Sequence, residues 1–299
     1  MYDKLSDYLS SRKIKFFSHY SMAKVSSIKA GGLAEFYVIP DSANDFIAII
    51  DYLYNRSMPC VTVGGVTNTL FASDMYRGTV LSTRGMRTIR SEGGLVVAEC
   101  GASLASVMSY AARIGLGGAE QLWLIPGTVG GAVRGNAGAH GLEMADIIEF
   151  ADIYFPKSAK VCRLCRDELE FSYRTSLAKK HRDAYVMSVG IRLSKACLKE
   201  IRERRRYFLK LRAESQPMGS PSLGCVFKRV EGVSAGYYID RAGLKGFAVG
   251  GAKVSEKHAG FIINAAGADH HDVASLVLAV ESIVGSRLGI ALNREIEIV

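Results

Sequence analysis

Two glycine-rich stretches are the clearest candidates for chemistry in this sequence. They are "VGGVTNTL" at residues 63–70 and "IPGTVGGAVRGNAGAHG" at residues 125–141, and both contain almost no acid–base side chains. Glycine loses much backbone entropy when it is fixed, so such runs indicate a positive φ or a bulky group close to the main chain. Open backbone N–H groups at the end of a strand bind phosphate or pyrophosphate. Neither stretch has the spacing of a known phosphate loop, so tight turns against a sheet remain an open alternative.

Cysteine residues could also do chemistry. The chain has six cysteines, and Cys162 and Cys165 form a C-x-x-C. A zinc site needs a second ligand pair at matching spacing, and a redox site needs a thioredoxin-like context. The sequence shows neither, so we expect reduced thiols.

The histidines form a second possible metal constellation. His270 and His271 stand where the last long helix should begin, and Asp269 or Asp272 is expected there as a helix cap. His258 is expected to order a loop of a substrate-binding unit. The sequence therefore predicts no metal site.

Composition limits the class of protein. A chain of 299 residues with 48% hydrophobic content can bury a core divided into two or three packed units. It shows no run of about twenty apolar residues and no signal-peptide pattern at the N-terminus, which predicts a cytoplasmic protein away from the membrane. The net charge of +9 is concentrated in a basic amphipathic helix at residues 199–212. Since no nucleic-acid-binding motif accompanies that helix, we expect no nucleic acid partner.

The apolar periodicity predicts alternating strands and helices. Strands are expected at residues 34–40, 60–65, 79–83, 94–100, 146–156 and 184–193, and helices at 42–57, 103–115 and 269–289. Ser42 is the expected cap of the first of these helices. The residues from 290 to the end form an extended run. A polar, proline-bearing segment after the basic helix indicates a boundary near residues 195–200.

Six motifs resemble one enzyme family in a fixed order. They are "VGGVTNTLFASD", "IPGTVGGAVRGNAGAHG", "SYRTS", "RAESQPMGSPSLGCVFKR", "AGLKGFAVGGAKVSEKHAGFIIN" and "LNREIEI". Together they are similar to the signatures of the UDP-N-acetylenolpyruvoylglucosamine reductases, the MurB family, from about Lys24 to the C-terminus. The resemblance is to the compact type, which lacks an extra inserted substructure.

The resemblance implies an α+β fold. An FAD-binding domain of the PCMH/vanillyl-alcohol-oxidase type is expected at 1–195, in two subdomains of about 1–80 and 81–195. A C-terminal α+β substrate-binding domain is expected at 196–299. It also implies a monomer or weak oligomer.

The resemblance further implies a non-covalent FAD, with NADPH as co-substrate. The enzyme would reduce UDP-N-acetylglucosamine enolpyruvate to UDP-N-acetylmuramate for peptidoglycan synthesis. The implied cofactor-binding residues are Gly64, Gly65, Val66, Thr67, Asn68, Pro126, Gly127, Thr128, Gly130, Gly131, Ala132, Asn136 and Gly138.

Three residues match the catalytic positions of the family. Arg174 of "SYRTS" would hold the substrate carboxylate, because a guanidinium binds a carboxylate bidentately. Cys225 stands where the family usually has a serine that donates a proton to carbon; a thiol is mostly protonated at neutral pH and is the stronger acid. Glu295 or Glu297 would be the third group, since both point to one face of an extended run. The family pattern selects Glu295.

Substrate binding is implied for Tyr173, Lys228, Lys253 and His258. Lys253, Arg229 and His140 differ from the usual family residues. Lys253 and Arg229 could add positive charge near the diphosphate. An FAD oxidase or dehydrogenase of the same fold is the alternative enzyme, and a basic nucleotide-binding module is the alternative from another class. The motifs of the C-terminal third disfavour the oxidase.

Overall fold

Short apolar runs separated by polar turns form most of the strands, as their side-chain pattern predicts. In the computed structural model, which describes residues 2–299, β7 and β13 are buried over most of their length. They occupy inner positions of a five-stranded sheet with the order β12-β11-β13-β7-β6. In this sheet β11 pairs with β12 and β13, β13 pairs with β7, and β6 pairs with β7, all antiparallel.

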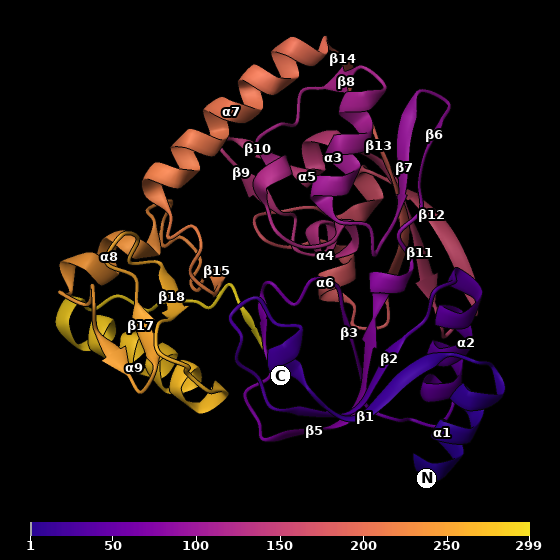
Figure 1. Ribbon diagram of the computed structural model, residues 1–299, viewed down its shortest axis with the longest axis horizontal. Coiled ribbons are helices and arrows are strands. Elements are labelled where there is room, and N and C mark those ends of the chain that lie inside the picture. The colour runs from indigo at the N-terminus through magenta and orange to yellow at the C-terminus, as the bar shows by residue number, and fades with distance from the viewer. Residues whose placement is uncertain (1) are drawn as a thin grey trace. The chain divides into compact units, whose positions relative to one another are not determined.

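The helices have the following bounds, with η marking 3₁₀ turns: α1 Tyr2–Ser11, η1 Met22–Lys24, α2 Ala43–Tyr54, η2 Thr83–Gly85, α3 Leu104–Arg113, η3 Leu122–Leu124, α4 Val129–Arg134, α5 Met144–Ile147, η4 Asp167–Leu169, α6 Leu177–Lys180, α7 Leu198–Ser215, α8 Ala235–Arg241 and α9 His270–Leu288. The strands are β1 Lys15–Ser21, β2 Leu33–Ile39, β3 Cys60–Val63, β4 Thr69–Leu70, β5 Met75–Ser82, β6 Ile89–Glu92, β7 Leu95–Glu99, β8 Leu116–Gly117, β9 Gly138–Ala139, β10 Leu142–Glu143, β11 Ile148–Phe155, β12 Lys160–Cys165, β13 Tyr185–Ile191, β14 Ser194–Lys195, β15 Ser222–Cys225, β16 Ala248–Val249, β17 Ala252–Val254, β18 Phe261–Asn264 and β19 Glu297–Ile298. Figure 1 shows most of these elements.

The chain divides into two compact units, and each is built from separate stretches of sequence. The first unit contains the N-terminal stretch up to Ser18, together with Phe36–Gly65 and Gly78–Leu209. The second unit contains His19–Glu35, Val66–Arg77 and Lys210–Val299. The predicted limits of a domain at 1–195 and another at 196–299 stay a prediction.

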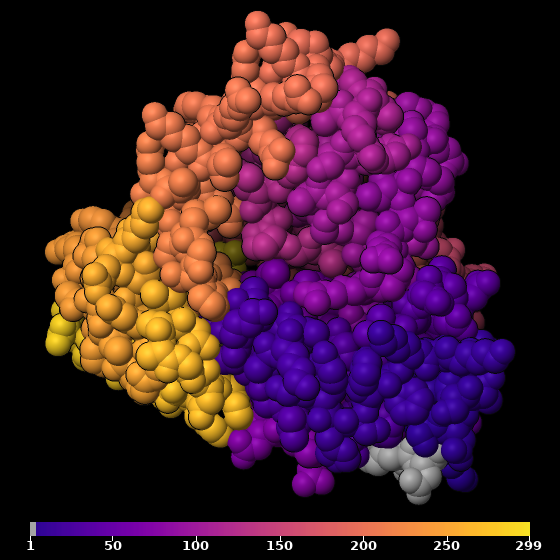
Figure 2. All heavy atoms as spheres, viewed as in Figure 1, coloured from indigo at the N-terminus to yellow at the C-terminus, as the bar shows by residue number. Residues whose placement is uncertain are grey.

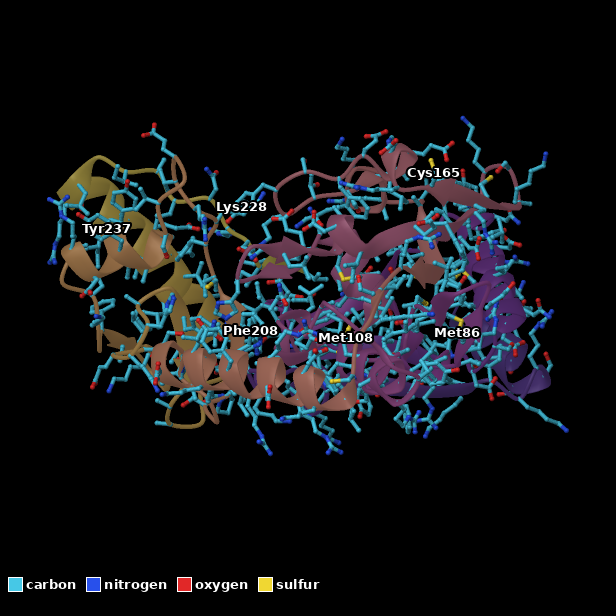
Figure 3. All side chains as sticks on the ribbon, turned by 90° about the horizontal axis from the view of Figure 1, so that it is seen from above. Met86, Met108, Cys165, Phe208, Lys228 and Tyr237 are labelled. Atoms are coloured by element: carbon cyan, nitrogen blue, oxygen red, sulfur yellow. The ribbon has the colours of Figure 1, made fainter. Side chains whose placement is uncertain are left out.

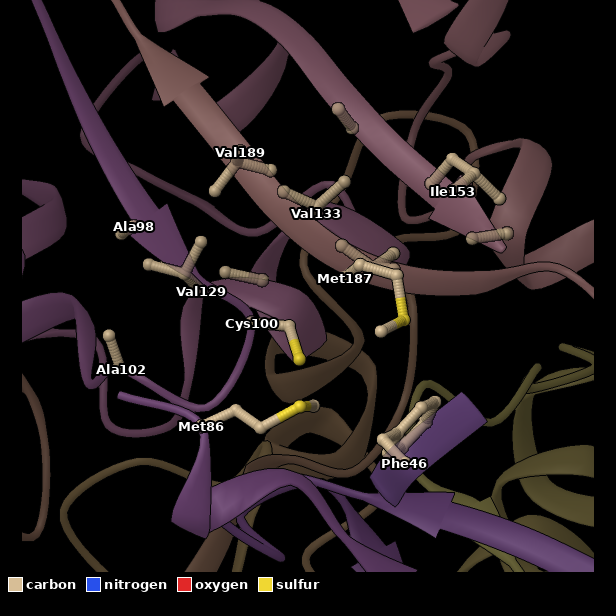
Figure 4. Close-up of a cluster of buried hydrophobic side chains, with 14 of the residues drawn as sticks. Phe46, Met86, Ala98, Cys100, Ala102, Val129, Val133, Ile153, Met187 and Val189 are labelled. Atoms are coloured by element: carbon tan, nitrogen blue, oxygen red, sulfur yellow. The ribbon is translucent and has the colours of Figure 1, made fainter. Parts of the chain in front are cut away.

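The core of the first unit lies around the five-stranded sheet. The helices α3 and α4 pack against this sheet (Figure 1). Figure 4 shows part of the resulting core, where Cys100 lies near Met86 and Val129. The α2 helix begins as predicted, because the Ser42 side chain accepts a hydrogen bond from the Asp45 N–H.

The second unit has its own sheet and core. The sheet has the order β15-β18-β17-β16, and the helix α9 contacts β16, β17 and β18. Asp269 caps α9 by accepting from the Asp272 N–H at 2.9 Å, as the sequence predicts. Gly289 ends the helix with φ +67°, a left-handed conformation that glycine adopts without strain.

The basic helix α7 is confirmed, with one turn more than predicted at its C-terminal end. Ile201 is its buried residue among those described, and Figure 2 shows its other side chains largely at the surface. Its first part is tied down by Arg204, whose Nε lies 3.3 Å from the buried carboxylate of Glu120. The Arg205 guanidinium lies over the Trp123 ring, 4.3 Å from its centroid.

Two regions differ from the sequence-based expectation. The extended run predicted from residue 290 to the end is strand only at Glu297–Ile298, where β19 pairs in parallel with β4. The N-terminal elements α1 and β1 were not predicted. Within residues 2–299, no helix is both long enough and apolar enough to cross a membrane.

Candidate active site

The longer glycine-rich stretch contains a short helix rather than a continuous loop. The helix α4 begins after Thr128, whose Oγ1 accepts a long 3.4 Å hydrogen bond from the Gly131 N–H. The shorter stretch packs directly against this cap, because a Cβ atom built on Gly64 would lie 2.1 Å from Thr128 Oγ1. Only a residue without a side chain allows the two stretches to approach this closely.

Gly130 and Gly131 are neighbours, but they face different surroundings. A Cβ atom on Gly130 would lie 2.7 Å from Cys100 Cβ, so the packed core around Cys100 requires a glycine here. A Cβ atom on Gly131 would meet Thr128 Oγ1 at 3.6 Å, which is an ordinary contact. Packing inside the chain therefore explains Gly130 and leaves Gly131 available to face a ligand.

The backbone N–H groups of this stretch are less available than the sequence suggested. We expected them to be open to a phosphate, and this is wrong for Val129 and Gly130. Their N–H groups donate to Ala102 O and Cys100 O, each at 2.8 Å. The acceptors lie just beyond the end of β7, a tertiary neighbour that sequence spacing does not reveal.

Several of the predicted site residues have an unusual backbone conformation. The φ angles are +51° at Val66, +41° at Asn136 and +56° at Arg174. A positive φ is sterically unfavourable for a β-branched residue such as valine, and such backbone strain is found most often at functional sites. These three residues come from three of the segments that the motifs identified.

Asn136 uses its side chain to organise the glycine-rich stretch. Its Nδ2 donates to Glu143 Oε2 at 2.7 Å and to the Ser172 carbonyl at 3.1 Å, while its Oδ1 accepts from the Ala145 N–H. The residue is 1% exposed. Both the side chain and the main chain of Asn136 therefore make contacts within the chain.

The same stretch holds Arg174. The guanidinium donates to the carbonyls of Asn136 and Gly138 over long distances of 3.4 and 3.5 Å. It also lies 5.4 Å from the centroid of the Tyr173 ring, and Tyr173 is exposed. The structure thus brings Arg174 together with the glycine-rich segment of the first unit.

The second unit brings the other two predicted catalytic residues together through their main chains. Cys225 ends β15, and the next residue, Val226, accepts a hydrogen bond from the Glu295 N–H at 2.8 Å. The Asn68 side chain donates to the Glu295 carbonyl at 3.1 Å. The Lys228 N–H donates to Asn293 O at 2.8 Å, so the two segments run alongside each other.

Two other substrate-binding candidates in the second unit, Lys253 and His258, already interact with nearby residues of the chain. Lys253 Nζ lies 2.6 Å from Glu256 Oε1 in an exposed ion pair. His258 Nδ1 accepts from the Gly260 N–H at 3.1 Å, which places the proton of the neutral ring on Nε2. Burial lowers the pKa of His258, so the neutral form is favoured.

Comparison with known proteins decides the family. An "FAD binding domain" model matches residues 34–164, and a "UDP-N-acetylenolpyruvoylglucosamine reductase, C-terminal domain" model matches residues 216–299. The reductase of Caldanaerobacter subterraneus subsp. tengcongensis is 37% identical over 99% of this chain and 97% of its own. The chain belongs to the UDP-N-acetylenolpyruvoylglucosamine reductase family.

Two further relatives of the reductase family support this assignment. The Thermosipho melanesiensis reductase is 40% identical, with 91% of each chain covered. The crystal structure of the Thermus caldophilus reductase matches with a TM-score of 0.80 at 29% identity, covering 95% of this chain and 98% of that one. The predicted family and the predicted α+β fold with an FAD-binding domain are confirmed. FAD is likewise confirmed as the cofactor of this member of the reductase family.

Sequence reasoning missed one neighbour of Cys225. Arg212, near the end of α7, is partly buried, and that burial lowers the pKa of its guanidinium, while the charge of Cys225 opposes the shift. The two side chains are therefore electrostatically coupled. Arg212 is the first residue of the motif that contains Cys225, and that position was the available signal.

His140, one of the departures from the family pattern, also has a tertiary contact. The centroids of the His140 and Phe208 rings lie 5.3 Å apart. Phe208 belongs to the part of α7 in the first unit (Figure 3). The pair connects the end of the glycine-rich segment to the basic helix. This contact gives a structural role to a residue that the motif alone left unexplained.

Proposed function

We propose that this protein uses NADPH and FAD to reduce the enolpyruvyl ether of UDP-N-acetylglucosamine to the lactyl ether, forming UDP-N-acetylmuramate for peptidoglycan synthesis. The observation that carries the proposal is the family match over almost the whole chain, at 37% identity. It includes both the FAD-binding part and the C-terminal part. The motif residues Arg174, Cys225 and Glu295 supply the groups that such a reaction needs.

The glycine-rich segment of the first unit fits an FAD. Gly131 has room on its outer side, and its N–H makes only a long bond to Thr128 Oγ1 that a phosphate oxygen can replace. Because Gly64 has no side chain, its main chain can lie directly against Thr128, the N-cap of α4. We assign the pyrophosphate to this region and propose the remaining predicted cofactor-binding residues as further contacts of the FAD.

Arg174 would hold the enolpyruvyl carboxylate. A bound FAD would supply the hydride chemistry by which NADPH reduces the enolpyruvyl group of the substrate. Negative charge then develops on the neighbouring carbon and its carboxylate, and a guanidinium aimed at that carboxylate stabilises it. The long bonds from Arg174 to two carbonyls orient the guanidinium beside the glycine-rich segment.

Cys225 would donate the proton that completes the reaction at carbon. A thiol must be neutral to donate a proton, whereas a nearby guanidinium favours the thiolate. Arg212 is a charged side chain that interacts electrostatically with Cys225.

Glu295 and the remaining residues would complete the substrate site. The Glu295 main chain is held by Val226 O, so the carboxyl group starts from a fixed position beside the Cys225 turn. We propose that Tyr173, Lys228, Lys253 and His258 contact the UDP-sugar. The neutral His258 would act as a hydrogen-bond donor through Nε2.

We also propose the finer features that the sequence predicted. The protein would act in the cytoplasm as a monomer or weak oligomer, without nucleic acid or membrane partners. The domain limits at 195 and 196 would separate FAD binding from substrate binding.

An anaerobic two-step experiment tests the proposal. Adding NADPH to the purified yellow protein should bleach the flavin absorbance, and adding UDP-N-acetylglucosamine enolpyruvate should restore it. A flavin that is bleached but is reoxidised only by oxygen would favour the alternative oxidase function. A protein without flavin absorbance would contradict the proposal.

A further inference from the structure

A cluster of possible metal ligands lies in the second unit, outside the predicted active site. Asp74 comes from the segment between β4 and β5, and His270 and His271 open α9. Asp74 Oδ1 lies 3.2 Å from His270 Nε2 and 2.9 Å from His271 Nε2. The three ligand atoms all lie within 4.8 Å of one another.

The spacing of Asp74 Oδ1 from each histidine nitrogen matches a tetrahedral transition metal. With metal–ligand bonds near 2.0–2.1 Å, neighbouring ligands of a tetrahedral zinc ion are about 3.3 Å apart. The two Nε2–Oδ1 distances are within a few tenths of an ångström of that value. An ion could therefore replace the hydrogen bonds with little movement, once each imidazole carries its proton on Nδ1.

Exposure and charge also suit a cation. The His270 side chain is 14% exposed, so its ring is held in place, whereas Asp74 and His271 are 85% and 60% exposed and leave access for an ion and a water ligand. The start of a helix disfavours cations. The carboxylates of Asp269 and Asp272 offset that effect, because both lie at this helix start.

We propose that Asp74, His270 and His271 form a binding site for one Zn²⁺ ion. Two imidazoles and a carboxylate are a donor set that zinc favours, with water in the fourth position. The sequence predicted no metal here because the third ligand lies 196 residues from His270. The ion would connect α9 to the segment that also carries Val66 and Asn68.

Calorimetric titration of the full-length, reduced protein with ZnCl₂ tests this site. The parent should bind one Zn²⁺ that His271→Ala binds at least about 100-fold more weakly, since outer-shell changes alone cost about 10–100-fold. Asp74→Asn should show a similar loss. His181→Ala is the matched control for loss of an exposed histidine, and Cys165→Ser is the control for binding by exposed thiols. Both controls should bind zinc like the parent.

Hydrogen exchange provides a second readout that does not depend on activity. Zinc should slow exchange in residues 69–77 of the parent and leave that segment unchanged in His271→Ala. Equal zinc affinity in the parent and His271→Ala would overturn the proposal. So would loss of binding in Cys165→Ser, because the ion would then be held by cysteine.

Discussion

The glycine-rich segment of the first unit and the Cys225 turn of the second unit are built in opposite ways. In the first, main-chain atoms and missing side chains shape the site, as Gly64 against Thr128 shows. In the second, backbone hydrogen bonds place two reactive side chains, Cys225 and Glu295, on neighbouring segments. Substitutions in the first should therefore change cofactor content, and substitutions in the second should change a rate while the cofactor stays bound.

The largest effect is expected at Cys225, and it tests the second half of this comparison. Cys225→Ala should keep its flavin and its reduction by NADPH, because hydride transfer to the flavin needs no proton from this residue. Reoxidation by the enolpyruvyl substrate should slow by about 10³-fold, since a general acid typically contributes 10²–10⁴-fold. Stopped-flow absorbance measures both steps.

Cys225→Ser is the matched control, because serine is the usual family residue. It should recover much of the lost rate. The rate of the parent should decline at alkaline pH as the thiol loses its proton, and that decline should move or vanish in the serine variant. Equal reoxidation rates in the parent and Cys225→Ala would remove Cys225 from the mechanism.

Arg174 is the exception in this comparison, because it is a proposed catalytic side chain in a site formed mostly by main-chain atoms. Arg174→Lys should retain FAD but lose about 3 kcal/mol of transition-state stabilisation, or about 100-fold in turnover. Lysine cannot reproduce a bidentate contact with a carboxylate. Steady-state rates and flavin content measured on the same preparation check this, and an unchanged rate would contradict the role of Arg174.

The neighbouring glycines test the first half of the comparison. Gly131→Ala should fold as stably as the parent, because its Cβ meets only an ordinary contact, yet it should bind FAD more weakly. Gly130→Ala should lose about 2 kcal/mol of stability, because its Cβ would overlap Cys100 in the core. Thermal unfolding and flavin absorbance distinguish the two variants. Normal flavin affinity in Gly131→Ala would move the cofactor away from this face.

The smallest effect concerns His258. Its lowered pKa in the folded state means that the unfolded chain binds more protons in mildly acidic solution. Stability should therefore rise as pH increases from 5 to 7, and this rise should be smaller in His258→Gln. Unfolding by urea at several pH values measures the slope, and parallel slopes would show that His258 is not buried in its neutral form.

Much of the fold was predictable because the signals are local. The caps Ser42 and Asp269, the basic helix and the buried strands β7 and β13 follow from residue type and from apolar periodicity within short windows. The candidate site was predictable as a set of motif residues, since each motif is contiguous. The N-terminal elements α1 and β1 were not among the predicted elements.

The sequence by itself determined the candidate catalytic residues, the type of most elements and the glycine content of the two glycine-rich stretches. Only the tertiary structure decided that Gly130 serves the core while Gly131 faces outward, because that depends on where Cys100 lies. It also decided that Asp74 meets His270 and His271. Contacts between residues far apart in the chain depend on the packing of whole elements, and no local pattern contains that information.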